Sequence, residues 1–150
     1  MFQLKTEDRL RSWREFRSSI DNLSLTDALR CTAELWANAS YTPYYLDIDE
    51  PTTWPSPWQM IDENIYCDVA KSLGIIYTML LTKHKKDLDI ELRVYVDVTT
   101  GAEYNLAWFN EGKYILNLVD REVVNIEQFD DTVFKLKRLY SSLELQLENY

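Results

Sequence analysis

The residues best suited to covalent chemistry in this chain are its two cysteines and its single histidine. Cys67 stands in WPSPWQMIDENIYCDVAKSLG, residues 54–74, behind a loop rich in proline and tryptophan and at the start of an apolar helical pattern. The thiolate is the nucleophilic form of cysteine, and the amide dipoles at the start of a helix favour it. Cys67 is therefore a candidate nucleophile. The alternative is a small residue packed beneath Trp54 and Trp58.

A thiol nucleophile in acyl transfer also needs a base that later returns the proton to the leaving group, and histidine serves near neutral pH. If one helix ran from Cys67 to His84, a rise of ~1.5 Å per residue would put them about 25 Å apart. A nucleophile and its base must lie within ~3 Å. His84 therefore cannot serve Cys67. Cys31 lies within a helical pattern, and with Cys67 it makes no disulfide framework or metal spacing, so we expect reduced thiols in a cytoplasmic setting.

Composition argues against several other classes of function. The formal net charge is −9, so we expect no direct contact with nucleic acid, which is held by clustered lysine and arginine. The longest apolar stretch falls short of the ~20 residues that cross a bilayer, so we expect no membrane insertion. Three scattered glycines make no phosphate-binding loop, and the acids of DIDE, residues 47–50, lack the spaced ligands of a calcium loop. We expect no cofactor and no metal.

Hydrophobic periodicity predicts the elements that position Cys67. Helical spacing indicates helices over roughly 7–20, 25–38 and 66–84, with a short helix starting at Pro57. Alternating residues in IELRVYVDV, AEYNLAWF and KYILNLVD indicate three antiparallel strands. Apolar residues at i, i+3 and i+4 predict a last helix over 126–150. We therefore expect one α+β domain over 1–150, with four to five helices on a small three-stranded antiparallel sheet.

Half of the chain, roughly 57–121, resembles a known family. The segment YCDVAKSLGIIYTMLL resembles the nucleophile helix of the transglutaminase-like branch of the papain-type cysteine enzymes, and NLAWFNEGKYILNLVD resembles their paired strands. In that family the first strand carries a histidine next to a tryptophan, and the second strand ends in an aspartate. The matching residues of this chain are Asn105, Leu106 and Trp108 on the first strand and Asp120 on the second.

The resemblance implies a site whose chemistry is incomplete. It puts Cys67 at the nucleophile position and Asp120 at the position of the orienting acid. Neither Asn105 nor Leu106 can act as a base near neutral pH, although one of them stands where the histidine should be. On these grounds we expect a degenerate transglutaminase-like fold that is not an enzyme.

An aromatic loop is the candidate for binding a partner. Prolines separate its rings, and a preorganised aromatic surface loses little conformational entropy on binding. The alternative is that the two tryptophans only cover the end of the central helix. The candidate residues are Tyr41, Tyr44, Tyr45, Trp54 and Trp58.

The function expected from the sequence is a noncatalytic, acidic protein-interaction or structural module in a larger, oligomeric assembly. The segment WPSPWQMI with its cysteine helix also resembles small proteins of tailed bacteriophages, which implies a virion component of the neck, tail or baseplate with other virion subunits as partners. One alternative is a cysteine-dependent acyl-transfer enzyme or peptidase in which Cys67 is the nucleophile and a partner supplies the base. The other is an acidic decoy of a nucleic-acid-binding protein, whose affinity would fall steeply with salt.

Overall fold

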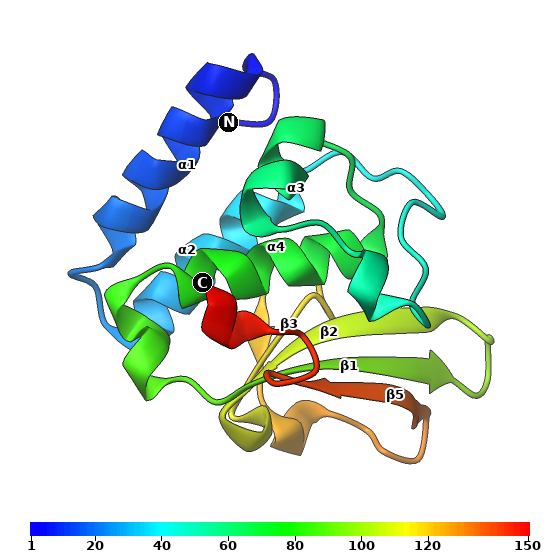
Figure 1. Cartoon of the computed structure of the whole chain (residues 1–150). Helices are drawn as coiled ribbons and strands as arrows, with labels where there is room; N and C mark the ends of the chain where they lie inside the picture. Colours follow the sequence, from blue (N-terminus) through cyan, green and yellow to red (C-terminus); the bar gives the residue numbers. More distant parts are fainter.

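A computed structural model describes all residues from 1 to 150 and places one antiparallel sheet against a layer of helices (Figure 1). The helices are α1 (Thr6–Ile20), α2 (Leu25–Ala37), α3 (Pro57–Glu63) and α4 (Asp68–Leu80). The strands are β1 (Ile90–Asp97), β2 (Glu103–Phe109), β3 (Tyr114–Leu116), β4 (Val123–Val124) and β5 (Phe134–Ser141). The predicted α+β class is confirmed, with five strands where three were expected.

Helix α4 is the centre of the molecule, as its apolar sequence predicts. Every residue from Ser72 to Leu80 is buried, because α2 and α3 pack on one side of the helix and the sheet on the other. The approach to α2 is so close that a side chain at Gly74 would overlap the Trp36 ring. Helix α1 lies outside this layer and is joined to α3 by Arg9, whose guanidinium donates to the carbonyls of Ile61 at 2.7 Å and Asp62 at 2.9 Å.

The ends of the helices follow from local capping. The Ser24 hydroxyl accepts from the Asp27 amide at 3.1 Å at the start of α2. Ser56 and Gln59 form a reciprocal capping box before α3. Cys67 occupies the position directly before α4, and its side chain makes no capping hydrogen bond. Helix α4 ends at Leu80, earlier than expected, because residues 83–87 form a separate turn of tighter helix.

The sheet has the order β4-β3-β2-β1-β5, and every pair is antiparallel. Alternation along the strands separates two faces. One face packs on α4 and includes Leu92, Val94, Ala107 and Phe109. The other carries Tyr95, Leu106, Trp108 and Ile115, against which Phe129 and Phe134 pack.

The predicted C-terminal helix over 126–150 is wrong, because residues 134–141 form strand β5. This strand pairs with the edge of β1, which would otherwise leave backbone groups without partners. A bulge places Lys137 between the partners of Val94 and Tyr95, and this extra residue breaks the alternation of period two. The apolar residues on either side of the bulge therefore have a spacing that imitates a helix. Lysines on the exposed strand are typical of a sheet edge.

None of the helices combines the length and the apolar character that crossing a lipid bilayer requires.

Candidate active site

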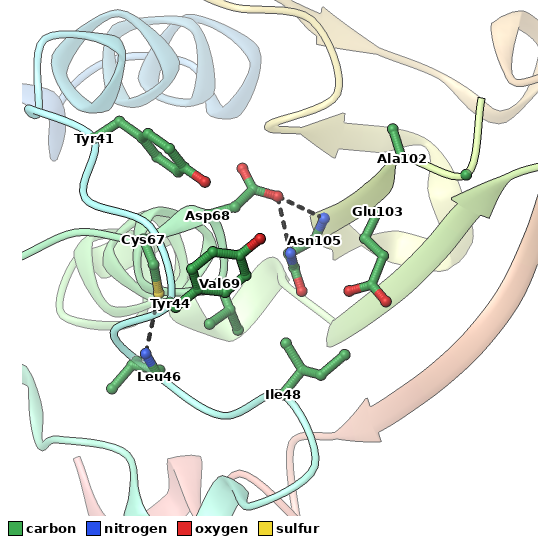
Figure 2. A pocket seen from close by; sticks show the side chains of 11 residues that line it. Tyr41, Tyr44, Leu46, Ile48, Cys67, Asp68, Val69, Ala102, Glu103 and Asn105 are labelled. Carbon is green, nitrogen blue, oxygen red and sulfur yellow. Dashed lines mark hydrogen bonds between the residues drawn. The ribbon is translucent and has the colours of Figure 1, made fainter.

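A hollow with a volume of about 500 Å³ lies where the start of α4 meets β2, next to Cys67. The loop over residues 41–48 forms one wall, and the turn between β1 and β2 forms another (Figure 2). The lining residues are Tyr41, Tyr44, Leu46, Ile48, Cys67, Asp68, Val69, Gly101, Ala102, Glu103 and Asn105. We refer to this space as the Cys67 cavity.

Cys67 reaches this cavity from the position directly before α4. The residue is only 5% exposed, and its Sγ accepts a hydrogen bond from the Leu46 amide at 3.4 Å. The first amides of α4 point toward the same end of the helix, where they favour negative charge. The sulfur thus has one hydrogen-bond donor, the Leu46 amide, and lies beside the start of a helix, both of which favour a thiolate.

A hydrogen-bonded group of two asparagines, one serine and one aspartate lies beside Cys67. Asp68 Oδ2 accepts from the backbone amide of Asn105 at 3.0 Å and from its Nδ2 at 2.9 Å. Asn117 Nδ2 donates to Asp68 Oδ1 at 3.1 Å, to the Asn105 carbonyl at 2.9 Å and to Ser72 Oγ at 3.1 Å. Since Ser72 also donates to the Asn105 carbonyl, the group ties α4 to β2 and to the end of β3.

Asn117 is a residue that the sequence reasoning missed. It follows β3 directly and has a φ of +72°, in the left-handed region that asparagine tolerates better than most residues. The only sequence signal is an asparagine at the end of a short apolar strand in YILNLVD. Asn117, and not Asp120, lies beside Asn105 in the folded chain.

The structure places the other residues matched by the family resemblance away from Cys67. Asn105 faces α4 from β2, whereas Leu106 and Trp108 point to the opposite face of the sheet. Asp120 is exposed and lines a different, small hollow next to Trp36. His84 lies past the far end of α4, buried, with its Nε2 donating to the Ile20 carbonyl at 3.0 Å. The site around Cys67 therefore contains no imidazole.

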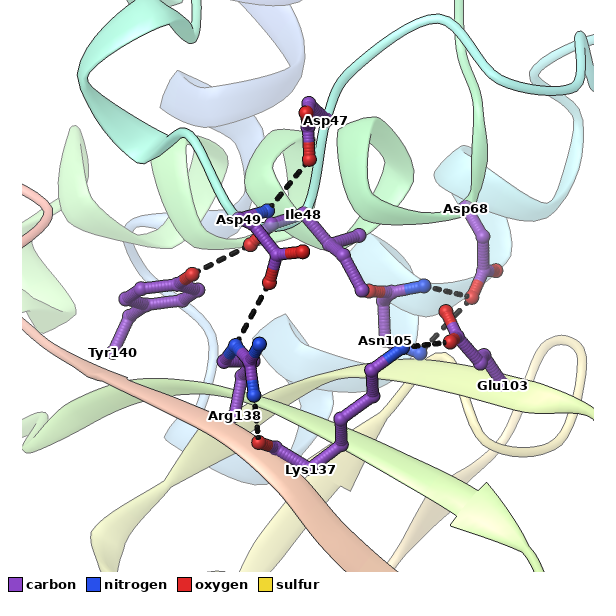
Figure 3. A network of polar contacts seen from close by, with 9 residues as sticks. All are labelled: Asp47, Ile48, Asp49, Asp68, Glu103, Asn105, Lys137, Arg138 and Tyr140. Carbon is purple, nitrogen blue, oxygen red and sulfur yellow. Dashed lines mark hydrogen bonds and ion pairs between the residues drawn. The ribbon is translucent and has the colours of Figure 1, made fainter.

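Strand β5 holds the loop that walls the cavity (Figure 3). Tyr140 Oη donates to the Ile48 carbonyl at 2.5 Å, and Arg138 Nε donates to Asp49 Oδ1 at 2.8 Å. Desolvation raises the pKa of the Tyr140 phenol, and the negative charge of Asp49 adds to the shift. Lys137 of the same strand pairs with Glu103 on the cavity wall. The structure has no group of three or more histidine, cysteine or acidic side chains suited to a metal ion.

The five aromatic candidates for partner binding divide among three places. Tyr41 and Tyr44 are 62% and 100% exposed and lie at the Cys67 cavity. Trp54 is half-buried against the Tyr140 ring, and half-buried Tyr45 donates to Glu63. Trp58 is partly exposed and packs edge-on against Trp13 of α1. Only the first pair offers largely free rings.

Of three comparisons with known proteins, the one with solved structures gives matches. No family sequence model matches the chain, and no curated protein matches it in sequence. Calcium-bound LapG from Legionella pneumophila matches the structure with a TM-score of 0.72 at 13% identity, over 93% of this chain and 81% of that one. The fold is transglutaminase-like. EGTA-treated LapG gives 0.71 at 13% identity over 91% and 77%, and a further LapG structure gives 0.71 at 14% over 96% and 86%.

The comparison overturns the expectation that the chain is not an enzyme, since LapG is an active cysteine protease of this fold. The expectation failed because it gave the missing histidine more weight than the placement of the thiol. The likeness itself concerns the fold, and any activity of this chain depends on its own residues. The resemblance to proteins of tailed bacteriophages, and with it a virion role, stays a prediction.

Proposed function

We propose that the chain is a cysteine-dependent acyl-transfer enzyme or peptidase in which Cys67 is the nucleophile. The observation that carries this proposal is the position of Cys67. It lies at the start of the central helix and lines an open cavity. The Leu46 amide already donates to its sulfur. The transglutaminase-like fold supports the proposal, because α4 is the segment whose sequence resembles the nucleophile helix of that family.

The reaction would begin with attack of the Cys67 sulfur on an acyl carbon, which forms a thioester and displaces the leaving group. The leaving group needs a proton, and a second nucleophile then releases the acyl group from the sulfur. Asp68 is not free for this proton transfer, because three N–H groups already engage its two oxygens. Glu103 is paired with Lys137, and no imidazole lies at the cavity, so we propose that the proton carrier comes from outside the chain. We assign it to a partner protein that docks over Tyr41 and Tyr44 at the cavity.

The proposal is tested by the chemistry of the thiol itself. Native protein is treated with iodoacetamide between pH 5 and 9, and with a p-nitrophenyl ester as an acyl donor, and the labelled residue is found by mass spectrometry. Cys67 should be alkylated in the native state and should hold the acyl group as a thioester that hydroxylamine releases. Cys67→Ser should abolish both signals.

Cys31→Ser is the matched control, since Cys31 lies on α2 outside the Cys67 cavity, and this variant should keep both signals at Cys67. Acylation that survives in Cys67→Ser, or a Cys67 that reacts only after unfolding, would make the cysteine a packing residue and end the proposal.

A further inference from the structure

Asn105 lines the Cys67 cavity, and its side chain has a hydrogen-bond acceptor that has no partner. The residue is 5% exposed, and its Oδ1 is buried without any partner. The orientation of the amide is fixed, because its Nδ2 donates to Asp68 and a carboxylate can only accept. Figure 2 shows Oδ1 turned away from Asp68. A buried acceptor without a donor is costly, so a ligand that brings an N–H group would be favoured here.

The charged residues of the cavity lining indicate which kind of ligand donor would bind there. The cavity lining includes two carboxylates, Asp68 and Glu103, and no lysine, arginine or histidine. Lys137 on β5 pairs with Glu103 from outside the lining and offsets part of its charge, so the negative charge of Asp68 is the one without a cationic partner. The rings of Tyr41 and Tyr44 are exposed at the same cavity, and aromatic faces attract cations. An acidic, aromatic space with a free acceptor fits a cationic donor better than a neutral one.

We propose that the Cys67 cavity binds the basic side chain of a peptide substrate, arginine or lysine, which donates an N–H group to Asn105 Oδ1. This inference rests on the proposed function, since the attacked acyl group would belong to the same peptide. Asn105 and Cys67 line one cavity, so the basic residue would lie next to the bond that reacts. Asn105 thus acts as a substrate-binding residue at the position of the missing base.

Binding can be measured without turnover in full-length Cys67→Ala protein. The probes are acetylated pentapeptide amides with glycine at every position except the third, which is arginine, lysine, citrulline or norleucine. Calorimetry gives the Kd, and the side-chain amide signal of Asn105 in a ¹⁵N NMR spectrum reports contact at the site. Arginine or lysine peptides should bind at least tenfold more tightly than the two neutral peptides, and the Asn105 signal should shift. The stronger of the two basic probes identifies the preferred cation.

Variants separate the acceptor from the general charge of the protein. Asn105→Leu removes Oδ1 and should weaken the basic peptide at least tenfold, while Glu103→Gln tests the cavity charge with little change of shape. Glu122→Gln removes one exposed charge elsewhere and should leave the Kd unchanged. If Asn105→Leu does not fold, Glu103→Gln together with the NMR shift decides the question.

Equal binding of all four peptides, or binding of none, would overturn the inference. The outcome is separate from that of the proposed function. A chain that acylates Cys67 but ignores the charge of the peptide would keep the function and lose this specificity. A chain that binds basic peptides but forms no thioester would lose the function.

Discussion

At the scale of single residues, the position opposite Cys67 determines which chemistry the site can perform. Of the two residues that the resemblance puts at the histidine position, Asn105 is the one that faces α4 and lines the Cys67 cavity. An amide does not take up a proton near neutral pH, whereas an imidazole does. The neighbouring Asp68 already accepts from the Asn105 side chain, so an orienting carboxylate is in place.

The substitution Asn105→His should therefore restore a base to the site. An imidazole held by Asp68 would take the thiol proton and return it to the leaving group, a contribution of about 10²–10⁴-fold in rate. We expect hydrolysis of a p-nitrophenyl ester by Asn105→His to exceed that of the native chain by at least tenfold, followed by absorbance at pH 7.

Asn22→His is the control, since Asn22 is exposed in the turn between α1 and α2. Free imidazole added to the native chain should reproduce part of the gain. If Asn105→His folds normally by circular dichroism and gains nothing, Cys67 and residue 105 do not share a reaction path.

At the scale of elements, one hydroxyl joins three helices. Thr78 on α4 accepts from the indole Nε1 of Trp13 at 3.0 Å and from that of Trp36 at 2.9 Å, and it donates to the Gly74 carbonyl at 2.6 Å. All three side chains are buried, so no water replaces a lost bond. The close approach of α2 at Gly74 keeps the Trp36 indole within reach of this hydroxyl.

Thr78→Val keeps the shape of the side chain and removes the hydroxyl. Each of the two indoles would be left as a buried donor without an acceptor, which costs about 1–3 kcal/mol apiece. We expect the free energy of unfolding to fall by about 2–6 kcal/mol in urea denaturation. Thr78→Ser keeps the hydroxyl, so it should lose clearly less. Equal losses in the two variants would show that packing of the methyl group, and not the indole bonds, sets the stability.

The elements also show what a sequence can reveal of this fold. The helices and the first three strands are visible because each has its own periodicity, and capping residues such as Ser24 and Ser56 mark their starts. Strand β5 is hidden, since its bulge at Lys137 removes the alternating pattern and its pairing with β1 is a long-range contact. Asn117 is hidden for a related reason, because only the register of β3 beside β2 brings it to Asp68 and Asn105.

At the scale of the whole molecule, buried phenols connect stability to pH. Burial raises the pKa of Tyr66 and of Tyr77 in the folded chain, chiefly by desolvation. An unfolded tyrosine ionises near pH ~10. The folded state therefore favours the protonated phenols, and this preference costs nothing below that pH. As the pH rises above ~10, the unfolded chain releases protons that the folded chain retains, so stability is lost.

We expect the free energy of unfolding to decrease steadily between pH 9.5 and 11.5 in urea titrations. The double variant Tyr66→Phe, Tyr77→Phe should be less stable at pH 7, because the Tyr77 hydroxyl donates to the Pro55 carbonyl at 2.9 Å, but its slope with pH should be smaller. Tyr44→Phe changes a fully exposed ring and should keep the native slope. A double variant with the native slope would refute the assignment to these phenols.

Because β5 holds the loop that walls the cavity, the shape of the cavity depends on a strand that is synthesised after the residues of the site. Residues 134–141 leave the ribosome after the segments that carry Cys67, Asp68 and Asn105, and until then β1 has a free edge. The loop around Ile48 and Asp49 has its two anchors, Tyr140 and Arg138, on that late strand. In a nascent chain, the Cys67 thiol would therefore lie beside a loop that β5 does not yet hold. The Cys67 cavity would take its final shape only after residues 134–141 have emerged and paired with β1.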